Sequence, residues 1–375
     1  MVQPAKRGII LLCAGGTGGH LFPAEALAHV LIARGHSVHL ATDERAARYS
    51  GTFPAERIHF IRSATIFGRS PLVLARALFA LARGYLQARS LLRQIRPVAA
   101  IGFGGYPTLP PMLAACHAGL PTLIHDANAV MGRANRVLSS RVTRIAVGFG
   151  SQNLPEHALV TGNPVRPAVI EAAQTPYPAR AAGDPFRLLV FGGSQGAQFF
   201  SNAVPEAVAQ LTGGERKLLQ IVQQARPEDK GRVAARYREL PAQAVVETFF
   251  ADLPKQIAAA HLTIARGGAG TVSELAVIGR PSILVPLPHA IDQDQARNAA
   301  ALAENGGAWV VRQSELSPER LAALLSEAIA QPERLAEAAQ KAQALGRPDA
   351  AAALADCVES IIAPVAGGQD RKNQA

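Results

Sequence analysis

Two glycine-rich turns are the segments of this 375-residue sequence best suited to hold a phosphate group. One runs from Gly15 to His20 and the other from Gly192 to Ala197, and each lies between a short apolar run and a stretch with helical spacing. Glycine permits a sharp turn and leaves backbone N–H groups accessible, and the positive end of the following helix favours an anion. Strand, glycine turn and helix make up the unit of a doubly wound sheet, so we predict two α/β domains facing a cleft.

A third glycine motif, residues 266–275, places a carboxylate close to the start of a helix. Glu274 would repel a phosphate there, but it can accept two hydrogen bonds from the hydroxyl groups of a ribose. The alternative is a capping box, because Thr271 and Glu274 have the T-x-x-E spacing of a helix N-terminus. The motif by itself leaves both interpretations open.

Basic residues are concentrated in the first half of the chain. Residues 1–163 contain 17 Lys and Arg against 6 Asp and Glu, whereas the rest of the chain contains 21 against 22. The asymmetry indicates a polyanionic partner for the N-terminal domain, either a nucleic acid or an anionic membrane surface. We predict no nucleic-acid binding, because the domain has no recognised nucleic-acid module and few aromatic residues for base stacking.

Residues 66–96 carry much of this charge on a predicted amphipathic helix. A basic stripe recurs every seven residues and comprises Arg69, Arg76 and Arg83. Apolar residues beside the stripe are predicted to project outward, namely Leu72, Phe79 and Leu86. Those predicted to face the core are Leu74, Leu78, Leu81, Tyr85 and Leu92. Arginine beside exposed apolar side chains suits anionic lipid headgroups, and the alternative is an ordinary helix with a solvated basic face.

Length and composition fit two globular domains. The chain is 49% hydrophobic and 18% charged, and no run approaches the roughly 18 apolar residues of a membrane span. The first residues lack the long apolar core of a signal peptide, so we expect a cytoplasmic protein. Cys13, Cys116 and Cys357 lie far apart without a metal-binding pattern, so we expect neither a disulfide framework nor a structural zinc.

The glycine turns require parallel strands to position them. The predicted strands are 9–12, 37–41, 98–103, 122–125, 188–191, 218–222, 245–250 and 262–265. Parallel sheets place their chemistry at the carboxyl ends of strands. Three such ends carry suggestive residues: the turn with His20, the motif 104–106, and the motif 125–128. The Pro- and Gly-containing segment 162–167 predicts a hinge between the domains.

In order along the chain, these motifs resemble the MurG family of GT-B glycosyltransferases, from about Gly8 to Ala299. The motifs that carry the resemblance are residues 15–20, 104–107, 125–128, 162–166, 192–197, 266–275, 286–289 and 292–299. The resemblance implies the GT-B fold, with two Rossmann-like domains. It also implies inverting transfer of N-acetylglucosamine from UDP-GlcNAc to the C4 hydroxyl of N-acetylmuramic acid in lipid I, the undecaprenyl-linked acceptor, which gives lipid II for peptidoglycan.

Other functions are compatible with parts of this pattern. A UDP-sugar epimerase shares the two-domain plan but leaves the basic helix 66–96 unexplained, and another GT-B enzyme with a lipid acceptor is a further alternative. An NAD-dependent oxidoreductase uses a glycine turn, yet residues 15–20 lack the G-x-G-x-x-G spacing and Glu274 has no role there. A non-catalytic membrane-binding protein leaves the nucleotide motifs without a role.

The resemblance also implies roles for individual residues. His20 would be the general base or would orient the transition state, and Asp126 competes for that role, although the family commonly has the longer Glu at its position. Glu274 would bind the ribose hydroxyls, Ser194 the diphosphate, and Phe250 would border the uracil. Further substrate-binding residues are predicted to be Thr17, Gly18, Gly19, Tyr106, Asn128, Arg166, Ala269, Gly270, Thr271, Val272, Ser273, Gln295 and Asn298.

The same resemblance sets the expected domain limits and location. We expect an N-terminal domain at 1–163, a UDP-sugar-binding domain at 164–345, a helix at 346–365 that packs back on the N-terminal domain, and a disordered tail at 366–375. The protein would act peripherally at the cytoplasmic face of the inner membrane. We expect no cofactor and no metal, because the acids of the D-x-D sequence 292–294 are better explained as helix N-terminal residues.

Overall fold

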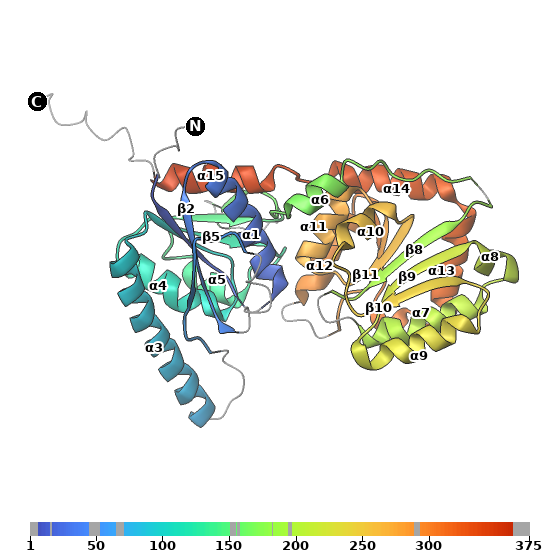
Figure 1. Ribbon diagram of the computed structural model, residues 1–375, viewed down its shortest axis with the longest axis horizontal. Helices are drawn as coiled ribbons and strands as arrows, with labels where there is room; N and C mark the ends of the chain where they lie inside the picture. Colours follow the sequence, from blue (N-terminus) through green and yellow to red (C-terminus); the bar gives the residue numbers. More distant parts are fainter. Residues whose placement is uncertain are drawn as a thin grey trace, which may run out of the picture. The chain divides into compact units, whose positions relative to one another are not determined.

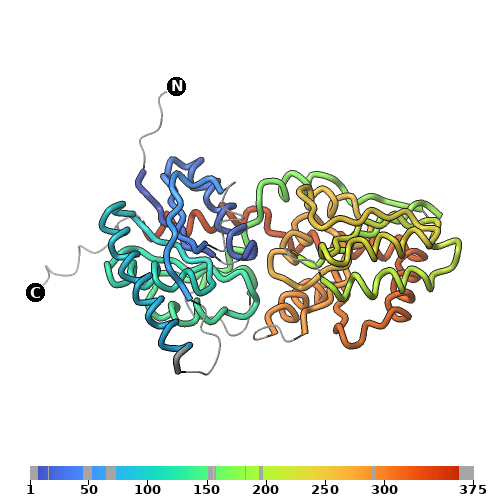
Figure 2. The backbone as a smooth tube through the Cα atoms, turned by 60° about the horizontal axis from the view of Figure 1, so that its bottom comes forward, coloured from blue at the N-terminus to red at the C-terminus, as the bar shows by residue number. Residues whose placement is uncertain are grey.

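A computed structural model of the protein describes residues 7–15, 17–44, 53–64, 71–150, 155, 158–181, 183–193, 197–288 and 293–362. The chain divides into two compact units (Figure 1, Figure 2), and each is built on one parallel sheet. The first comprises the described residues of Met1–Ala127, Met131–Pro164 and Asp349–Ala375. The second comprises Asn128–Val130 and the described residues of Val165–Pro348. The predicted α/β class with two doubly wound sheets is confirmed.

The first unit contains a seven-stranded sheet with the order β3-β2-β1-β4-β5-β6-β7. Its strands are β1 (Ile9–Cys13), β2 (Ser37–Thr42), β3 (Arg57–Phe60), β4 (Ala99–Gly102), β5 (Thr122–Asp126), β6 (Arg144–Val147) and β7 (Ala158–Val160). Its helices are α1 (Gly18–Ala33), α3 (Pro71–Ile95), the 3₁₀ turn η2 (Tyr106–Thr108), α4 (Leu109–His117), α5 (Arg133–Leu138) and α15 (Ala350–Ile362). Because helices cover both faces, strands such as β2 and β4 are buried along their whole length.

The second unit contains a six-stranded sheet with the order β10-β9-β8-β11-β12-β13, which is the 3-2-1-4-5-6 order of a Rossmann fold. Its strands are β8 (Phe186–Phe191), β9 (Leu219–Gln224), β10 (Gln243–Glu247), β11 (Leu262–Ala265), β12 (Ser282–Leu284) and β13 (Ala308–Val310). Its helices are α6 (Pro167–Ala172), α7 (Gln198–Gln210), α8 (Gly213–Leu218), α9 (Pro227–Arg238), α10 (Leu253–Ala259), α11 (Ala269–Ile278), α12 (Asp294–Ala303), η4 (Gln313–Glu315), α13 (Pro318–Ala330) and α14 (Pro332–Ala344).

All eight strands predicted from the sequence are present, with shifts of a few residues at their ends. The largest shift is in β10, which ends at Glu247, so Phe250 lies in the following loop and not in the strand. Strands β3, β6, β7, β12 and β13 are not among these eight. They contain only three or four residues, and β3 and β7 are partly exposed, so their apolar pattern is weak.

Helix α3 buries only part of the predicted face: Leu92 is buried and Leu81 and Tyr85 are half-buried, as predicted. Arg76, Arg83, Phe79 and Leu86 are exposed as predicted, but Leu74 and Leu78 are also exposed, so their assignment to the core was wrong. The buried face instead begins with small residues, Ala77, Gly84 and Ala88, and continues to Leu91 and Leu92. A Cβ atom at Gly84 would lie 1.9 Å from the carbonyl oxygen of Arg62, so close backbone approach selects the small side chains. Arg69 lies outside the described residues, as does the side chain of Leu72.

Helix α15, which ends the described chain, packs against α1 in the first unit (Figure 1). Leu354 and Val358 join the core of that unit. Three basic side chains converge on the carboxylate of Glu359: Arg34 at 2.8 Å, His36 at 3.1 Å and Arg7 at 3.2 Å. Burial opposes ionisation of this carboxyl group, but its hydrogen bonds to His36 and Arg34 outweigh burial and lower its pKa. Within the described ranges, no helix is both long and apolar enough to cross a bilayer.

We predict that Glu359→Gln loosens α15, because the amide cannot compensate the charge of the cations around it. Loss of about 1–2 kcal/mol would raise hydrogen exchange of the α15 amides about 10-fold. Asp356→Asn on the same helix is the control, since Asp356 is 71% exposed and, among the residues that the structure describes, forms its ion pair with Arg34; it should change exchange less than about twofold. Equal effects of the two variants would contradict a specific role for Glu359.

Candidate functional site

In the first unit, three neighbouring strands bring the predicted chemical groups to one edge of the sheet. β4 pairs with both β1 and β5, and all three run parallel. The turn after β1 leads to His20 in the first turn of α1, and β4 leads to Gly104 and Gly105. β5 ends on Asp126. Because the carboxyl ends of parallel strands meet at the same edge, residues from three distant sequence segments form one group.

The ring of His20 lies against the glycine pair that follows β4. Gly104 and Gly105 have φ angles of +86° and +78°, which other residues rarely adopt. A Cβ atom at Gly104 would lie 3.4 Å from Cε1 of His20, and one at Gly105 would lie 3.3 Å from its Cδ2. Burial lowers the pKa of His20, while the Asp126 carboxylate and the Phe103 carbonyl act in the opposite direction. The ring is therefore neutral at pH 7 and can accept a proton.

Asp126 is buried and its carboxylate binds the protein itself. Oδ2 accepts a hydrogen bond from the backbone N–H of Gly132 at 2.8 Å and another from Nδ2 of Asn135 at 2.9 Å. Nδ2 of Asn135 also donates to the carbonyl of His125 at 3.1 Å. These bonds close the loop between β5 and α5. Asn135 was not predicted from the sequence, because its only signal is its position ten residues after the His125 motif.

The remaining predicted residues of the first unit lie close to this group. Thr17 is the N-cap residue of α1, without a capping hydrogen bond from its side chain, and it is exposed. Gly18 is buried and Gly19 exposed at the start of the helix. Tyr106 begins η2 directly after the glycine pair and packs partly against the core.

In the second unit, the predicted ribose ligand Glu274 lies inside α11 and is almost fully buried. The N-cap residue of this helix is Gly268, so Thr271 belongs to the first turn and the alternative of a Thr271 capping box is wrong. Nη2 of Arg166 lies 3.3 Å from Oε1 of Glu274. Burial raises the pKa of Glu274, while the charge and hydrogen bond of Arg166 act against this rise. Arg166 therefore helps to keep a buried carboxylate ionised.

The first turn of α11 presents backbone N–H groups rather than side chains. The first backbone hydrogen bond of the helix runs from Val272 to the carbonyl of Gly268, which leaves the N–H groups of Ala269, Gly270 and Thr271 without a partner within the helix. A Cβ atom at Gly270 would meet no atom within 4 Å. Val272 is buried in the helix packing, so its side chain is not placed to bind a ligand.

Asn298 is fully buried and bonds three protein groups. Its Oδ1 accepts from the N–H of Ala129 at 2.8 Å, and its Nδ2 donates to Oδ1 of Asn128 at 3.0 Å and to the carbonyl of Gly267 at 3.3 Å. Oε1 of Gln295 accepts from the N–H of Leu287 at 2.9 Å. Asn298 thus holds the segment Asn128–Val130, which belongs to the second unit.

The other predicted residues of this unit are less completely defined. Phe250 is partly exposed in the loop after β10, and Ser273 is partly exposed on α11. Ser194, the predicted diphosphate ligand, lies outside the described residues. Asp294 begins α12, and its carboxylate accepts from the N–H of Gln295 at 2.7 Å, as expected for a helix N-terminal acid. Across the described ranges, no three His, Cys, Asp or Glu side chains form a group that could hold a metal ion.

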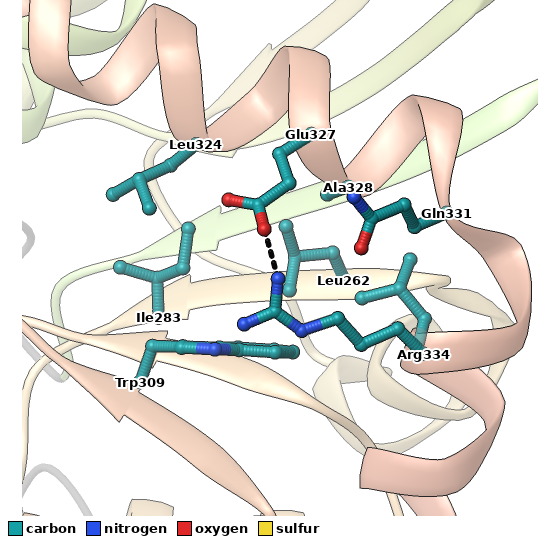
Figure 3. A pocket seen from close by; sticks show the side chains of 9 residues that line it. Leu262, Ile283, Trp309, Leu324, Glu327, Ala328, Gln331 and Arg334 are labelled. Carbon is teal, nitrogen blue, oxygen red and sulfur yellow. Dashed lines mark hydrogen bonds and ion pairs between the residues drawn. The ribbon is translucent and has the colours of Figure 1, made fainter.

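A pocket beneath α13 and α14 is a separate feature of the second unit (Figure 3). Leu262, Ile283 and Trp309 form its floor, and the guanidinium of Arg334 lies over the Trp309 ring at 5.3 Å and pairs with Glu327. Its volume of about 20 Å³ suffices for about one water molecule. The pocket is far too small for a nucleotide sugar and plays no part in the candidate site.

Comparison with known proteins identifies the family. The glycosyltransferase family 28 N-terminal domain matches residues 10–147, and the family 28 C-terminal domain matches residues 187–354. The chain is 57% identical over 361 residues to the UDP-N-acetylglucosamine–N-acetylmuramyl-(pentapeptide) pyrophosphoryl-undecaprenol N-acetylglucosamine transferase of Brucella suis biovar 1, covering 96% of this chain and 95% of the relative. It is 56% identical over 359 residues to the Agrobacterium fabrum protein of the same name, covering 95% of each. The crystal structure of Acinetobacter baumannii MurG matches with a TM-score of 0.76 and 30% identity, over 94% of this chain and 99% of that one.

The chain belongs to the MurG family.

It is therefore a glycosyltransferase of family 28 with the GT-B fold, as the sequence motifs predicted. A UDP-GlcNAc 2-epimerase from Neisseria meningitidis, solved with UDP-GlcNAc, also matches, with a TM-score of 0.64 and 13% identity over 94% of this chain and all of that one. At such low identity the likeness concerns the fold alone. The epimerase alternative therefore has no support beyond the shared architecture of MurG-family and epimerase chains.

The Arg166–Glu274 pair of this MurG-family chain predicts a pH dependence. If the carboxylate binds the ribose, affinity for UDP falls as the pH drops through the raised pKa of Glu274. Arg166→Gln should raise that pKa further and move the fall in affinity to higher pH. Calorimetric titration of UDP between pH 5 and 8 measures this, with Arg226→Gln, which removes an ion-paired arginine of the same unit, as the control. A loss of affinity for Arg166→Gln that is uniform across pH would mean that Arg166 acts on the ligand and not on Glu274.

Proposed function

We propose that this chain transfers N-acetylglucosamine from UDP-GlcNAc to the C4 hydroxyl of N-acetylmuramic acid in lipid I. The near full-length match to transferases named for this reaction carries the proposal. Each unit also contributes groups that the reaction needs. The second has a carboxylate that can accept hydrogen bonds from a ribose and helix N–H groups without a partner within the helix, and the first has a neutral histidine.

The second unit binds the donor. Glu274 accepts hydrogen bonds from the ribose hydroxyls, and Arg166 keeps its carboxylate ionised. The N–H groups that begin α11 point toward the diphosphate, where the helix dipole favours negative charge. Phe250 borders the uracil, and Gln295 binds hydroxyl groups of the sugar. Asn298, whose amide is bonded to protein groups, acts by holding Asn128 in place rather than by binding the sugar itself.

His20 acts as the general base. Its ring takes the proton from the C4 hydroxyl as the oxygen attacks the anomeric carbon and the bond to the UDP oxygen breaks. A single displacement of this kind inverts the anomeric centre and yields a β(1→4) linkage. Negative charge grows on the departing UDP, and the amino-terminal N–H groups of α11 stabilise it without a metal ion.

Asp126 positions this group rather than taking the proton. Oδ2 already accepts two hydrogen bonds that close the loop between β5 and α5. Protonation of Asp126 would weaken both, so proton transfer to it would disturb the loop. Its charge instead favours protonation of His20, because an imidazolium beside a carboxylate is stabilised.

The exposed face of α3 binds the membrane that carries the acceptor. Phe79 and Leu86 are 64% and 62% exposed, and the Arg83 guanidinium lies 5.7 Å from the Phe79 ring centre. A groove of about 500 Å³ between α3 and α4 continues the basic surface, and the described residues that line it include Arg89, Arg93 and no carboxylate. Arginine headgroup contacts and inserted apolar side chains together anchor a peripheral protein. The chain therefore acts at the cytoplasmic face of the inner membrane.

We predict that His20→Ala lowers kcat by about 10²–10⁴-fold with little change in donor KM, as expected for loss of a general base. In the wild type, activity should fall on the acid side as His20 becomes protonated, and this limb should disappear from the residual rate of the variant. Asp126→Asn is the comparison and should retain the acid limb. A fewfold loss for His20→Ala, with loss of the acid limb in Asp126→Asn, would transfer the role to Asp126.

We also predict that Phe79→Ser combined with Leu86→Ser reduces binding to vesicles containing phosphatidylglycerol at least about 10-fold, since two apolar side chains no longer enter the bilayer. Phe249→Ser is the matched control, because Phe249 is 65% exposed but lies in the second unit. Sedimentation with anionic and with neutral vesicles measures the effect. Unchanged binding of the double variant would exclude this face of α3.

A further inference from the structure

Gln224, the last residue of β9, connects two loops at the carboxyl edge of the second sheet. β9 pairs with β8 on one side and with β10 on the other. Oε1 of Gln224 accepts a hydrogen bond from the N–H of Gly192 at 3.1 Å, and its Nε2 donates to the carbonyl of Thr248 at 3.2 Å. One buried side chain thus binds the turn after β8 and the loop after β10.

We propose that Gln224 is a positioning residue for the donor, which sets the spacing between the loop that holds the diphosphate and the loop that borders the uracil. The inference rests on the proposed function, because it takes the Gly192 turn and the Phe250 loop as parts of the UDP site. Gln224 does not touch the donor. It acts through Gly192, two residues before the predicted diphosphate ligand Ser194, and through Thr248, two residues before Phe250.

The chemistry of the two partners requires an amide at this position. Gly192 offers a donor and Thr248 offers an acceptor, so the residue between them must accept at one atom and donate at the other. In the observed orientation of its amide, glutamine accepts at Oε1 and donates at Nε2. Glutamate keeps the bond to Gly192 but sets a carboxylate against the Thr248 carbonyl, and an aliphatic residue makes neither bond.

The bond to Gly192 also orients the turn. With its N–H directed at Gln224, the peptide plane between Phe191 and Gly192 is fixed, and Gly193 follows with a φ of +89°. The side chain is buried, so a lost bond there is not replaced freely by water. The turn and the loop are on strands that do not pair with each other, and Gln224 provides a direct hydrogen-bonded connection between them.

Gln223 provides a matched control one residue earlier. Successive strand residues point to opposite faces of the sheet. Gln223 is fully buried, accepts from the hydroxyl of Tyr237 at 2.6 Å and donates to the carbonyl of Phe200 at 3.2 Å. It makes the same kind of two-sided amide contact, but with helices α7 and α9 in the core rather than with the donor loops.

The test compares Gln224→Met and Gln224→Glu with Gln223→Met, by calorimetric titration of UDP and of UMP and by thermal unfolding. Both Gln224 variants should raise the Kd of UDP about 10-fold, with a donor KM that rises more than kcat falls. Gln224→Met should melt no lower than Gln223→Met, because each variant loses two hydrogen bonds of a buried amide. Gln223→Met should melt at a lower temperature and bind UDP as the wild type does, since it removes the hydrogen bond of the Tyr237 hydroxyl and a side-chain bond to the Phe200 carbonyl in the core.

The outcomes separate this inference from the proposed function. If the wild type does not bind UDP, the proposed function fails. If the wild type binds UDP and the Gln224 variants bind it equally well, Gln224 is a structural residue and the inference is overturned. The inference is also overturned if, in Gln224→Met and Gln223→Met alike, the loss of UDP affinity only parallels the decrease in melting temperature. A larger loss for UDP than for UMP would show that the effect includes the Gly192 side, because UMP lacks the second phosphate.

Discussion

Parallel strand pairing is the constraint on which the candidate residues of each unit depend. In a parallel sheet the carboxyl ends of all strands lie at the same edge, and the chain must return through a helix before the next strand begins. The segment after each strand is therefore both a loop and the start of a helix, with N–H groups that lack partners. In the first unit this edge gathers His20, the Gly104 pair and Asp126 from three strands. In the second it gathers the Gly192 turn, Gln224 and the start of α11.

Sequence reasoning found most of this framework because the signals are local. An apolar run indicates a strand, and where glycines and a helical pattern follow it, the segment specifies strand, turn and helix. Eight strands were predicted from such local signals. Short strands escaped prediction because three or four half-buried residues carry little pattern. Part of the buried face of helix α3 was predicted wrongly for another reason. The helix packs so closely there that only small residues fit, and it buries Ala77, Gly84 and Ala88 instead of large apolar side chains.

Side-chain pairing at the sites could not be inferred in the same way. The choice between a ribose ligand and a capping residue for Glu274 depended on where α11 begins, and the T-x-x-E spacing is compatible with either start. That Arg166 pairs with Glu274 depends on two segments more than 100 residues apart meeting in the fold. Asn135 and Gln224 carry no motif. They matter because of the backbone groups beside them, and those groups are adjacent only in three dimensions.

Asp126, Gln224 and Asn298 share one physical role that explains why each is buried despite its polarity. Each bonds backbone groups of loops that have left the sheet and so have no ladder partner. A buried backbone N–H or carbonyl without a partner is costly, and a side chain that supplies the partner also fixes the direction of the peptide. The loops proposed to bind a charged ligand are thus fixed by side chains that form their own hydrogen bonds with protein groups. These three residues therefore position the loops, and other residues at the same sheet edges contact the substrate.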